Sequence, residues 1–223
     1  MSRRHSARAA RALIALAAAQ KPDVIAATGD ILDNFSDLKE SGLSDFYAAL
    51  LDICPVFAVT GNHELRTEGP AFWRRALGDM GVQVLDNRFT RLRRGNSALV
   101  LMGLAGNTPY LPGFFQDIDK SLPKILLSHR PEFWEPASCW AHSPALTLSG
   151  HAHGGQVRLP GGFGLFAPGQ GLFPKYTSGL YAGGGRMLLV SRGIIQGRFP
   201  PRINNKPHLP VIRLRCGETI PYS

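Results

Sequence analysis

The first half of the chain alternates short apolar runs with stretches of helical periodicity. Apolar and β-branched side chains dominate residues 24–28, 56–60 and 82–85, whereas residues 43–53 and 71–80 repeat apolar positions at helical spacing. Residues 8–20 also suit an amphipathic helix, with Leu13, Ile14 and Ala17 on one face and Arg11 turned away from it. This alternation predicts a parallel α/β layer.

The second half contains apolar runs with few helical stretches between them. The runs are residues 98–102, 125–127, 145–148, 187–190 and 211–214. The 25 glycines and 17 prolines of the chain cluster in this half, which indicates turns that join short strands. We therefore predict a mixed sheet here, packed face to face against the first sheet with helices outside. Residues 1–223 are long enough for one substantial core and are expected to form a single domain.

The amino terminus also has the pattern of a signal peptide, in which Arg3 and Arg4 precede the apolar run 13–19. Cleavage after that run would delete the helix that is expected to cover one side of the first sheet. An amphipathic helix is therefore the favoured interpretation. No stretch of the sequence is long and apolar enough to span a bilayer.

The formal net charge of +9 favours anionic partners such as phosphorylated substrates. The basic residues are scattered and lack the interleaved aromatic side chains on which bases stack, so dedicated nucleic-acid binding is not expected. The three cysteines are widely spaced, which indicates neither a disulfide framework nor a thiolate zinc site. We expect a protein of a reducing compartment, the cytoplasm.

Polar side chains that can bind a metal follow four of the predicted strands. They are Asp30, Asn62, His63, His129, His151 and His153. Taken singly, each is typical of a turn, a cap or a partly buried pair. Loops at the carboxyl ends of strands converge on one crevice, however, so their joint placement indicates a site. Oxygen and imidazole ligands without thiolate suit a divalent cation of intermediate hardness.

Four segments around these residues resemble, in order and spacing, the motifs of calcineurin-like metallophosphoesterases. The segments are Gly29-Asp30-Ile31-Leu32-Asp33, Gly61-Asn62-His63-Glu64, Leu127-Ser128-His129-Arg130-Pro131 and Gly150-His151-Ala152-His153-Gly154-Gly155. Ser191-Arg192-Gly193 and residues 201–214 also resemble a bacterial subgroup of small phosphodiesterases. The resemblance implies a hydrolase with an α/β fold of four layers, αββα, in which two mixed sheets pack face to face between flanking helices.

The resemblance also implies a role for each residue of the site. Asp30 would bridge two divalent cations of a binuclear centre, which manganese, iron, zinc or cobalt could form. Asn62, His129 and His151 would complete the shell of the second cation, and His153 would bind the first. His63 would lie beside the substrate and protonate the leaving alkoxide, with Asp33 orienting its imidazole.

The sequence departs from the family pattern before Asp30. The family begins with a strand that ends in Asp-x-His and supplies two further ligands, and no such element precedes residue 30. We expect the first strand of the fold to be missing, so that the domain is incomplete at its amino terminus and the strand at residues 24–28 lies at an edge. One hypothesis is a start codon assigned too late; the rival is a shortened, catalytically impaired protein that keeps one cation and binds phosphorylated ligands without turnover.

The expected activity is hydrolysis of a phosphodiester or pyrophosphate bond by a metal-activated hydroxide. The substrate would be a small phosphorylated molecule, with a phospholipid-like or sugar-nucleotide lipid as one candidate. A basic amphipathic first helix suits peripheral contact with an anionic membrane, although a solvated helix has the same pattern. Arg130, Arg192 and Arg202 could clamp phosphate but are interpreted as surface charges. Gly154 is expected to allow a tight turn beside the site.

Overall fold

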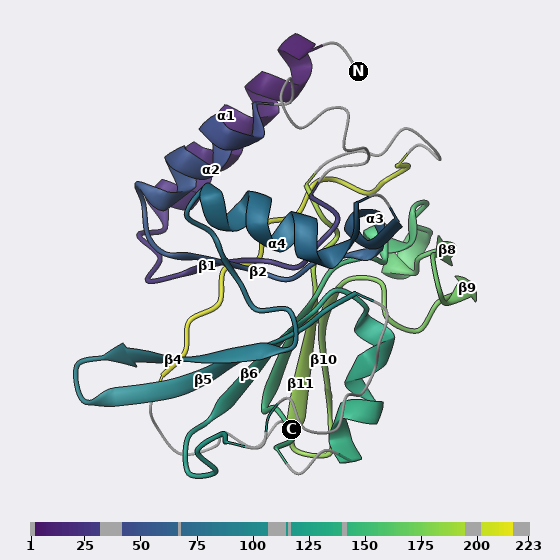
Figure 1. Ribbon diagram of the computed structural model, residues 1–223. Coiled ribbons are helices and arrows are strands. Elements are labelled where there is room, and N and C mark those ends of the chain that lie inside the picture. The colour runs from purple at the N-terminus through teal and green to yellow at the C-terminus, as the bar shows by residue number, and fades with distance from the viewer. Residues whose placement is uncertain are drawn as a thin grey trace.

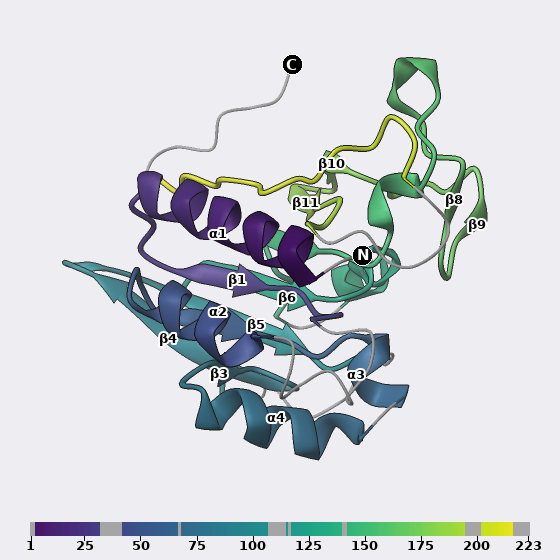
Figure 2. The ribbon, with the colours of Figure 1, turned by 90° about the horizontal axis from the view of Figure 1, so that it is seen from above.

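Two β-sheets lie against each other in the computed structural model, which describes residues 3–31, 42–66, 68–106, 115, 117–139, 142–194 and 202–215. The smaller sheet has three short parallel strands in the order β1 (Ile25–Ala27), β2 (Val56–Ala58) and β3 (Gln83–Val84). Helices α1 (Arg3–Ala19), α2 (Leu43–Leu51) and α4 (Gly69–Asp79) cover its outer face (Figure 1). Figure 2 shows these three helices side by side over the sheet.

Apolar side chains of the helices form the core above the smaller sheet. Tyr47, Trp73 and Leu77 are almost fully buried in this cluster. Ala17 of α1 is buried in the same cluster and Ile14 packs against it, which confirms the apolar face expected for the first helix. This helical layer fixes the smaller sheet and the loops at the carboxyl ends of its strands.

The larger sheet has six strands and is mixed. Its order is β10 (Gly179–Gly183), β11 (Arg186–Val190), β7 (Leu146–Ser149), β6 (Lys124–Ser128), β5 (Ser97–Leu104) and β4 (Arg88–Arg94). The central strands β5, β6, β7 and β11 are parallel, and an antiparallel hairpin partner flanks them at each edge. The carboxyl ends of β6 and β7 therefore open at the same rim.

The two sheets share an apolar core. Because side chains alternate along a strand, Val56 and Ala58 of β2 face the helices while Phe57 and the following Val59 face the larger sheet. The larger sheet contributes Leu101, Ile125, Leu127 and Leu146 to this layer. On its other face, the 3-10 helices η2 (Pro131–Trp134) and η3 (Pro136–Cys139) add Trp134 and Ala137 to the outer clusters.

A projecting region follows β7 and precedes β10. It contains the 3-10 turns η4 (His153–Gly155) and η5 (Pro160–Gly162) and a small antiparallel hairpin of β8 (Phe166–Ala167) and β9 (Gly171–Leu172). Figure 1 shows the β8–β9 hairpin at the right of the molecule, on the same side as α3 (Asn62–Arg66) and far from α1.

The predicted parallel layer followed by a mixed sheet, with helices outside, is confirmed. The strand at residues 24–28 lies at an edge of its sheet as expected, since β1 pairs with β2 in the described residues. The prediction of a strand at residues 211–214 is wrong: residues 206–215 form no strand, and Val211, Ile212 and Leu214 are exposed. An apolar run becomes a strand only where a neighbour accepts its hydrogen bonds.

Two edge strands were not predicted from the pattern. β4 contains four arginines among its seven residues and is mostly exposed, as edge strands often are. β10 is a glycine-rich strand that pairs with β11 through the turn at Gly184 and Gly185. Among the described helices, none combines the length and apolar character needed to cross a bilayer.

Candidate metal centre

The loop after β1 turns sharply to present Asp30. Gly29 has a φ of 91°, and Asp30 itself has a φ of 54°, a conformation that costs energy for a residue with a Cβ. A Cβ at Gly29 would lie 2.6 Å from the amide nitrogen of Gly61, so glycine is needed where this loop meets the loop after β2. The two loops are therefore in direct contact.

A buried carboxylate holds these two loops together. The Glu64 side chain is fully buried and accepts backbone hydrogen bonds from Asp30 (2.9 Å), Ile31 (2.7 Å) and Gly61 (2.7 Å). In return, the Asp30 Oδ1 atom accepts a hydrogen bond of 3.0 Å from the backbone N–H of His63. Each loop thus fixes the other, and the Asp30 carboxylate points into the space between the sheets' carboxyl ends.

His129 follows β6 and faces Asp30 directly. Its Nδ1 atom lies 2.7 Å from the carbonyl oxygen of Thr28, which can only accept, so Nδ1 carries a proton and the ring orientation is set. Its Nε2 atom lies 3.2 Å from Asp30 Oδ2 and 3.1 Å from Asn62 Oδ1. An unprotonated Nε2 would face two oxygens lone pair to lone pair, so this position calls for a proton or a cation.

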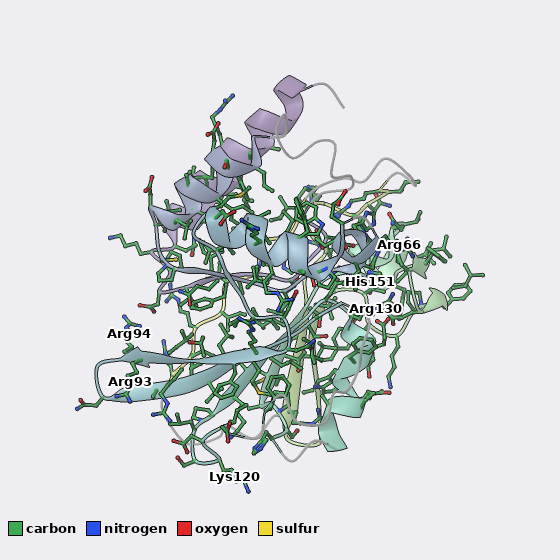
Figure 3. The ribbon with its side chains drawn as sticks, viewed as in Figure 1. Arg66, Arg93, Arg94, Lys120, Arg130 and His151 are labelled. Carbon is green, nitrogen blue, oxygen red and sulfur yellow. The ribbon has the colours of Figure 1, made fainter. Side chains whose placement is uncertain are left out.

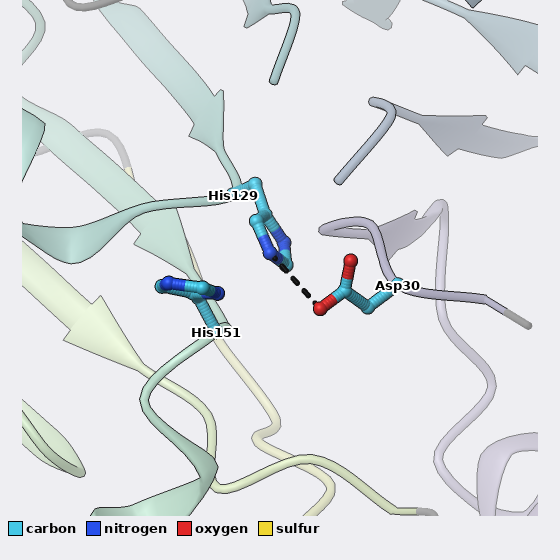
Figure 4. Close-up of side chains that lie close together, drawn as sticks. All are labelled: Asp30, His129 and His151. Atoms are coloured by element: carbon cyan, nitrogen blue, oxygen red, sulfur yellow. Dashed lines mark ion pairs between the residues drawn. The ribbon is translucent and has the colours of Figure 1, made fainter. Parts of the chain in front are cut away.

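His151 completes the cluster from the loop after β7. Its ring centroid lies 4.6 Å from that of His129, and one ligand atom from each of Asp30, His129 and His151 lies within 4.8 Å of the others (Figure 4). Within the described part of the chain, both ring nitrogens of His151 are buried without a hydrogen-bond partner. A buried imidazole without partners is costly unless something binds it. The donor set therefore fits a divalent cation.

The charges of the cluster favour the ionisation states that bind cations. Burial alone would raise the pKa of Asp30, but the hydrogen bond and positive charge of His129 hold it well below its usual value. Burial, followed by the charge of His129, lowers the pKa of His151 to about 3. Asp30 is therefore a carboxylate and His151 a neutral imidazole at neutral pH, so neither of these two ligands needs to lose a proton to bind a cation.

A cavity of about 200 Å³ opens over this cluster. Its lining includes Asp30, Asn62, His63, Arg66, Arg130, His151, His153, Pro168 and Gly169. Figure 3 shows Arg66, Arg130 and His151 on the same side of the molecule, opposite Arg93 and Arg94. The His63 Nε2 atom is 3.9 Å from Asp30 Oδ2, and its half-buried ring stays accessible from the cavity. The cavity thus combines a candidate metal cluster with cationic side chains.

The structure brings together most of the residues predicted from the sequence. Asp30, Asn62, His129 and His151 share one cluster, and His63 lies beside it. His153 lines the same cavity but stands outside the group of closely spaced ligand atoms found among the described residues. Burial, followed by the charge of Arg202, lowers its pKa. The role proposed for Asp33 concerns a residue outside the described ones.

Some residues that shape the site were missed. Glu64 belongs to the second of the four motifs, but the motif gave no role for it. No sequence pattern pointed to Arg66. Arg130 was interpreted as a surface charge, yet it lines the cavity and pairs with Glu132 at 3.0 Å. Asn205, from the stretch after residue 201, donates to the backbone carbonyls of His153 (2.6 Å) and Gln156 (3.1 Å). Only the folded chain shows that these residues meet.

Comparison with known proteins places the cluster in a family. The family model described as calcineurin-like phosphoesterase matches residues 4–155, which include every residue of the cluster. The chain belongs to the calcineurin-like phosphoesterase family. The expected family, fold class and enzyme class, a phosphoric ester hydrolase, are thereby confirmed.

Relatives of this calcineurin-like phosphoesterase extend the match beyond residue 155. The chain is 32% identical over 209 residues to phosphodiesterase YaeI of Escherichia coli, covering 90% of this chain and 73% of the relative. It is 29% identical over 205 residues to the metallophosphoesterase YkuE of Bacillus subtilis, covering 87% and 68%. A solved phosphopantetheinyl hydrolase from Mycobacterium tuberculosis has a TM-score of 0.48 and 11% identity, over 76% of this chain and 78% of that chain.

Proposed function

We propose that this chain hydrolyses a phosphodiester or pyrophosphate bond in a metal-dependent reaction at the cavity over Asp30, His129 and His151. The observation that carries the proposal is the convergence of their ligand atoms within 4.8 Å, beneath a cavity that cationic side chains also line. Family membership supports the class of reaction. The name of the relative YaeI, a phosphodiesterase, supports a diester over a monoester.

Asp30, Asn62, His129 and His151 would hold a divalent cation, with His153 as a ligand for a second one. When bound, such cations would polarise the phosphate and activate a water molecule for attack at neutral pH. Asn62 contributes a neutral oxygen, so the ligand set keeps a net positive charge toward an anionic substrate once a cation is present. Manganese, iron, zinc and cobalt all suit this set of oxygen and imidazole ligands.

His63 is proposed to hand a proton to the leaving alkoxide. Its backbone N–H is anchored to Asp30, and its imidazole faces the cavity beside the cluster rather than within it. A group that touches substrate but not the cation suits general acid catalysis. Arg66 and Arg130 line the same cavity and would attract the phosphate and orient it.

Turnover of bis(4-nitrophenyl) phosphate, after chelation and then with added Mn²⁺, tests this function. We expect activity to depend on the metal and to exceed activity on 4-nitrophenyl phosphate. Asp30→Asn should abolish it, whereas Asp45→Asn, at an exposed position on α2, should not. Metal-independent turnover, or full activity of the Asp30 variant, would contradict the proposal.

A second candidate is a single-cation protein that binds phosphorylated ligands without turnover. It is supported by the close grouping of one carboxylate and two imidazoles in the described residues, with His153 outside that group. Elemental analysis separates the two functions. One tightly bound cation per chain with no measurable hydrolysis favours the binding protein, and two cations with turnover favour the enzyme.

A further inference from the structure

Large apolar side chains are exposed in the region after β7, which also contributes Pro168 and Gly169 to the cavity lining. Phe163 and Phe173 each expose 70% of their surface, and Leu172 exposes 68%. Leu159, Phe166 and Ile203 are also exposed. These six residues are called the apolar rim below. Burying such side chains would be favourable, and clusters of them on a protein surface usually mark a contact with something else.

The local backbone holds the rim together. Phe166 and Leu172 are direct partners across the β8–β9 hairpin, so their side chains lie on one face. The Leu159 N–H donates to the Phe163 carbonyl across the turn of η5, at 2.8 Å. The Arg158 N–H donates to the Ile203 carbonyl at 3.0 Å, which fixes Ile203 beside the same turn. These contacts order the η5 turn with Ile203 and the β8–β9 hairpin. The Phe173 N–H donates to the Leu165 carbonyl at 2.9 Å, which ties the hairpin to the residues between η5 and β8.

The rim is continuous with the candidate active site. Pro168 and Gly169, in the turn between β8 and β9, line the cavity over the metal cluster. The β8–β9 hairpin projects from the same side of the molecule as Arg66, Arg130 and His151 (Figures 1 and 3). A surface that the rim contacts would thus face the cavity mouth.

The charge around the rim is positive. Residues 157–176 contain Arg158 and Lys175 but no aspartate or glutamate, and Lys175 is paired with Glu135 of the preceding segment. Two further cations are exposed: Arg66, which lines the cavity, and Lys206, which lies three residues after Ile203. Burial, followed by the positive charge of Arg192, lowers the pKa of Arg158. Arg192 therefore adds a second positive charge near the η5 turn. Exposed apolar groups among cations match an anionic lipid surface.

We propose that the apolar rim docks on an anionic lipid bilayer and that the cavity takes the phosphorylated headgroup of an amphiphile from that surface. The aromatic and leucine side chains enter the boundary between headgroups and acyl chains, and the cations contact the anionic headgroups. The substrate part of this proposal rests on the proposed phosphoesterase function, whereas the docking part does not. It also moves the expected membrane contact from the first helix to the rim.

Two alternatives agree less well with the structure: self-association through the rim, and membrane contact through α1. Two copies of this basic chain would bring Arg66 and Lys206 of each copy toward like charges, which opposes self-association through this face. The first helix exposes Leu16, but it lies far from the β8–β9 hairpin and the cavity (Figures 1 and 2). A membrane held at α1 would not present a headgroup to the cavity.

Vesicle sedimentation of the full chain tests the docking without any turnover. Vesicles of phosphatidylcholine alone are compared with vesicles that contain phosphatidylglycerol, at low and high salt. We expect binding to the anionic vesicles that weakens in high salt. The double substitution Phe163→Ser with Phe173→Ser should weaken it at least ~10-fold, because each phenylalanine loses a favourable apolar transfer. Leu16→Ser is the matched control and should bind like the parent.

Three outcomes would overturn the proposal. In the first, the parent and the double variant bind anionic vesicles equally. In the second, Leu16→Ser weakens vesicle binding and the double variant does not. In the third, the parent does not bind vesicles but is a dimer in light scattering, and the double variant is a monomer. Phe163→Trp keeps the apolar character and reports its surroundings, and its emission should shift to the blue with anionic vesicles. Hydrolysis of a water-soluble diester by the parent tests the proposed function separately, so either part can fail alone.

Discussion

The substitution Glu64→Gln removes the charge that holds the loops of Asp30 and Asn62 together. The parent carboxylate is fully buried, and its Oε2 atom accepts hydrogen bonds from the backbone of Asp30 and Gly61. Its Oε1 atom accepts the hydrogen bond from Ile31. Glutamine has nearly the same shape but only one acceptor oxygen, so at least one backbone N–H must face an NH₂ group.

The expected cost follows from these contacts. The best placement keeps the glutamine oxygen at the Oε2 position, where two hydrogen bonds survive without the help of a charge. The Ile31 N–H then loses its acceptor and meets a donor. A hydrogen bond to a charged group contributes about 1.5–3 kcal/mol, and a buried unsatisfied donor costs about 1–3 kcal/mol. We expect the free energy of unfolding to fall by about 3 kcal/mol, a large part of a typical domain's stability of roughly 5–15 kcal/mol.

Urea denaturation of metal-free protein measures this change, with Glu68→Gln as the matched control. Glu68 lies two residues beyond the end of α3, which contains Glu64, but it is exposed, and its side chain makes no capping hydrogen bond at the start of α4. The control should stay within about 0.5 kcal/mol of the parent. Since Glu64 positions Asp30, its variant should also bind Mn²⁺ at least ~10-fold more weakly. A Glu64 variant as stable as the control would refute the reasoning.

Three further predictions concern the backbone, the pH response and the proton donor. Gly29→Ala should lower the free energy of unfolding by about 3 kcal/mol, because its Cβ would meet the Gly61 backbone. Gly95→Ala, also at positive φ but with open space around it, should lower it by about 1 kcal/mol. Equal losses in urea denaturation would contradict the close approach of Gly29 to Gly61. His151 has a pKa of about 3 when folded and an ordinary value of 6.5, so the unfolded chain binds its proton more readily between these values. The stability of the metal-free protein should therefore decline as pH falls below about 6.5, by about 4 kcal/mol at pH 3, and His151→Gln should flatten the unfolding profile. His63→Gln should slow hydrolysis of an alkyl phosphodiester by about 10²–10⁴-fold but leave a 4-nitrophenyl ester, whose leaving group needs no proton, within about tenfold; equal losses on both substrates would exclude the acid role.

Sequence patterns predicted the strands that lie in the interior of the fold. β2, β5 and β6 contain continuous runs of apolar residues, because most of their positions are buried on both faces, and β7 has leucines on either side of a buried threonine. The same patterns predicted that the candidate ligands gather together, since the carboxyl ends of parallel strands meet at one rim. Local sequence was enough in these cases because burial on both faces leaves little choice of partner.

The pattern failed where structure depends on a distant partner. Residues 211–214 are as apolar as a strand but have no strand in the described structure, whereas the arginine-rich β4 is a strand because β5 pairs with it along its whole length. The cavity lining contributed by Arg66, Pro168 and Gly169 has no signal in the sequence for the same reason. Such features depend on which loops the fold brings together.

The geometry of the cluster also depends on energy that the rest of the fold supplies. Asp30, His151 and His153 all have positive φ values, at 54°, 59° and 49°, although each has a Cβ that disfavours this region. Each such residue costs about 1–3 kcal/mol and persists only where its surroundings hold it. Glu64 holds the first of these turns and Asn205 holds the last, through hydrogen bonds to backbone atoms over 34 and 52 positions of sequence. The candidate metal ligands are therefore recognisable in the sequence, but their arrangement is enforced by residues whose role appears only when the distant segments meet.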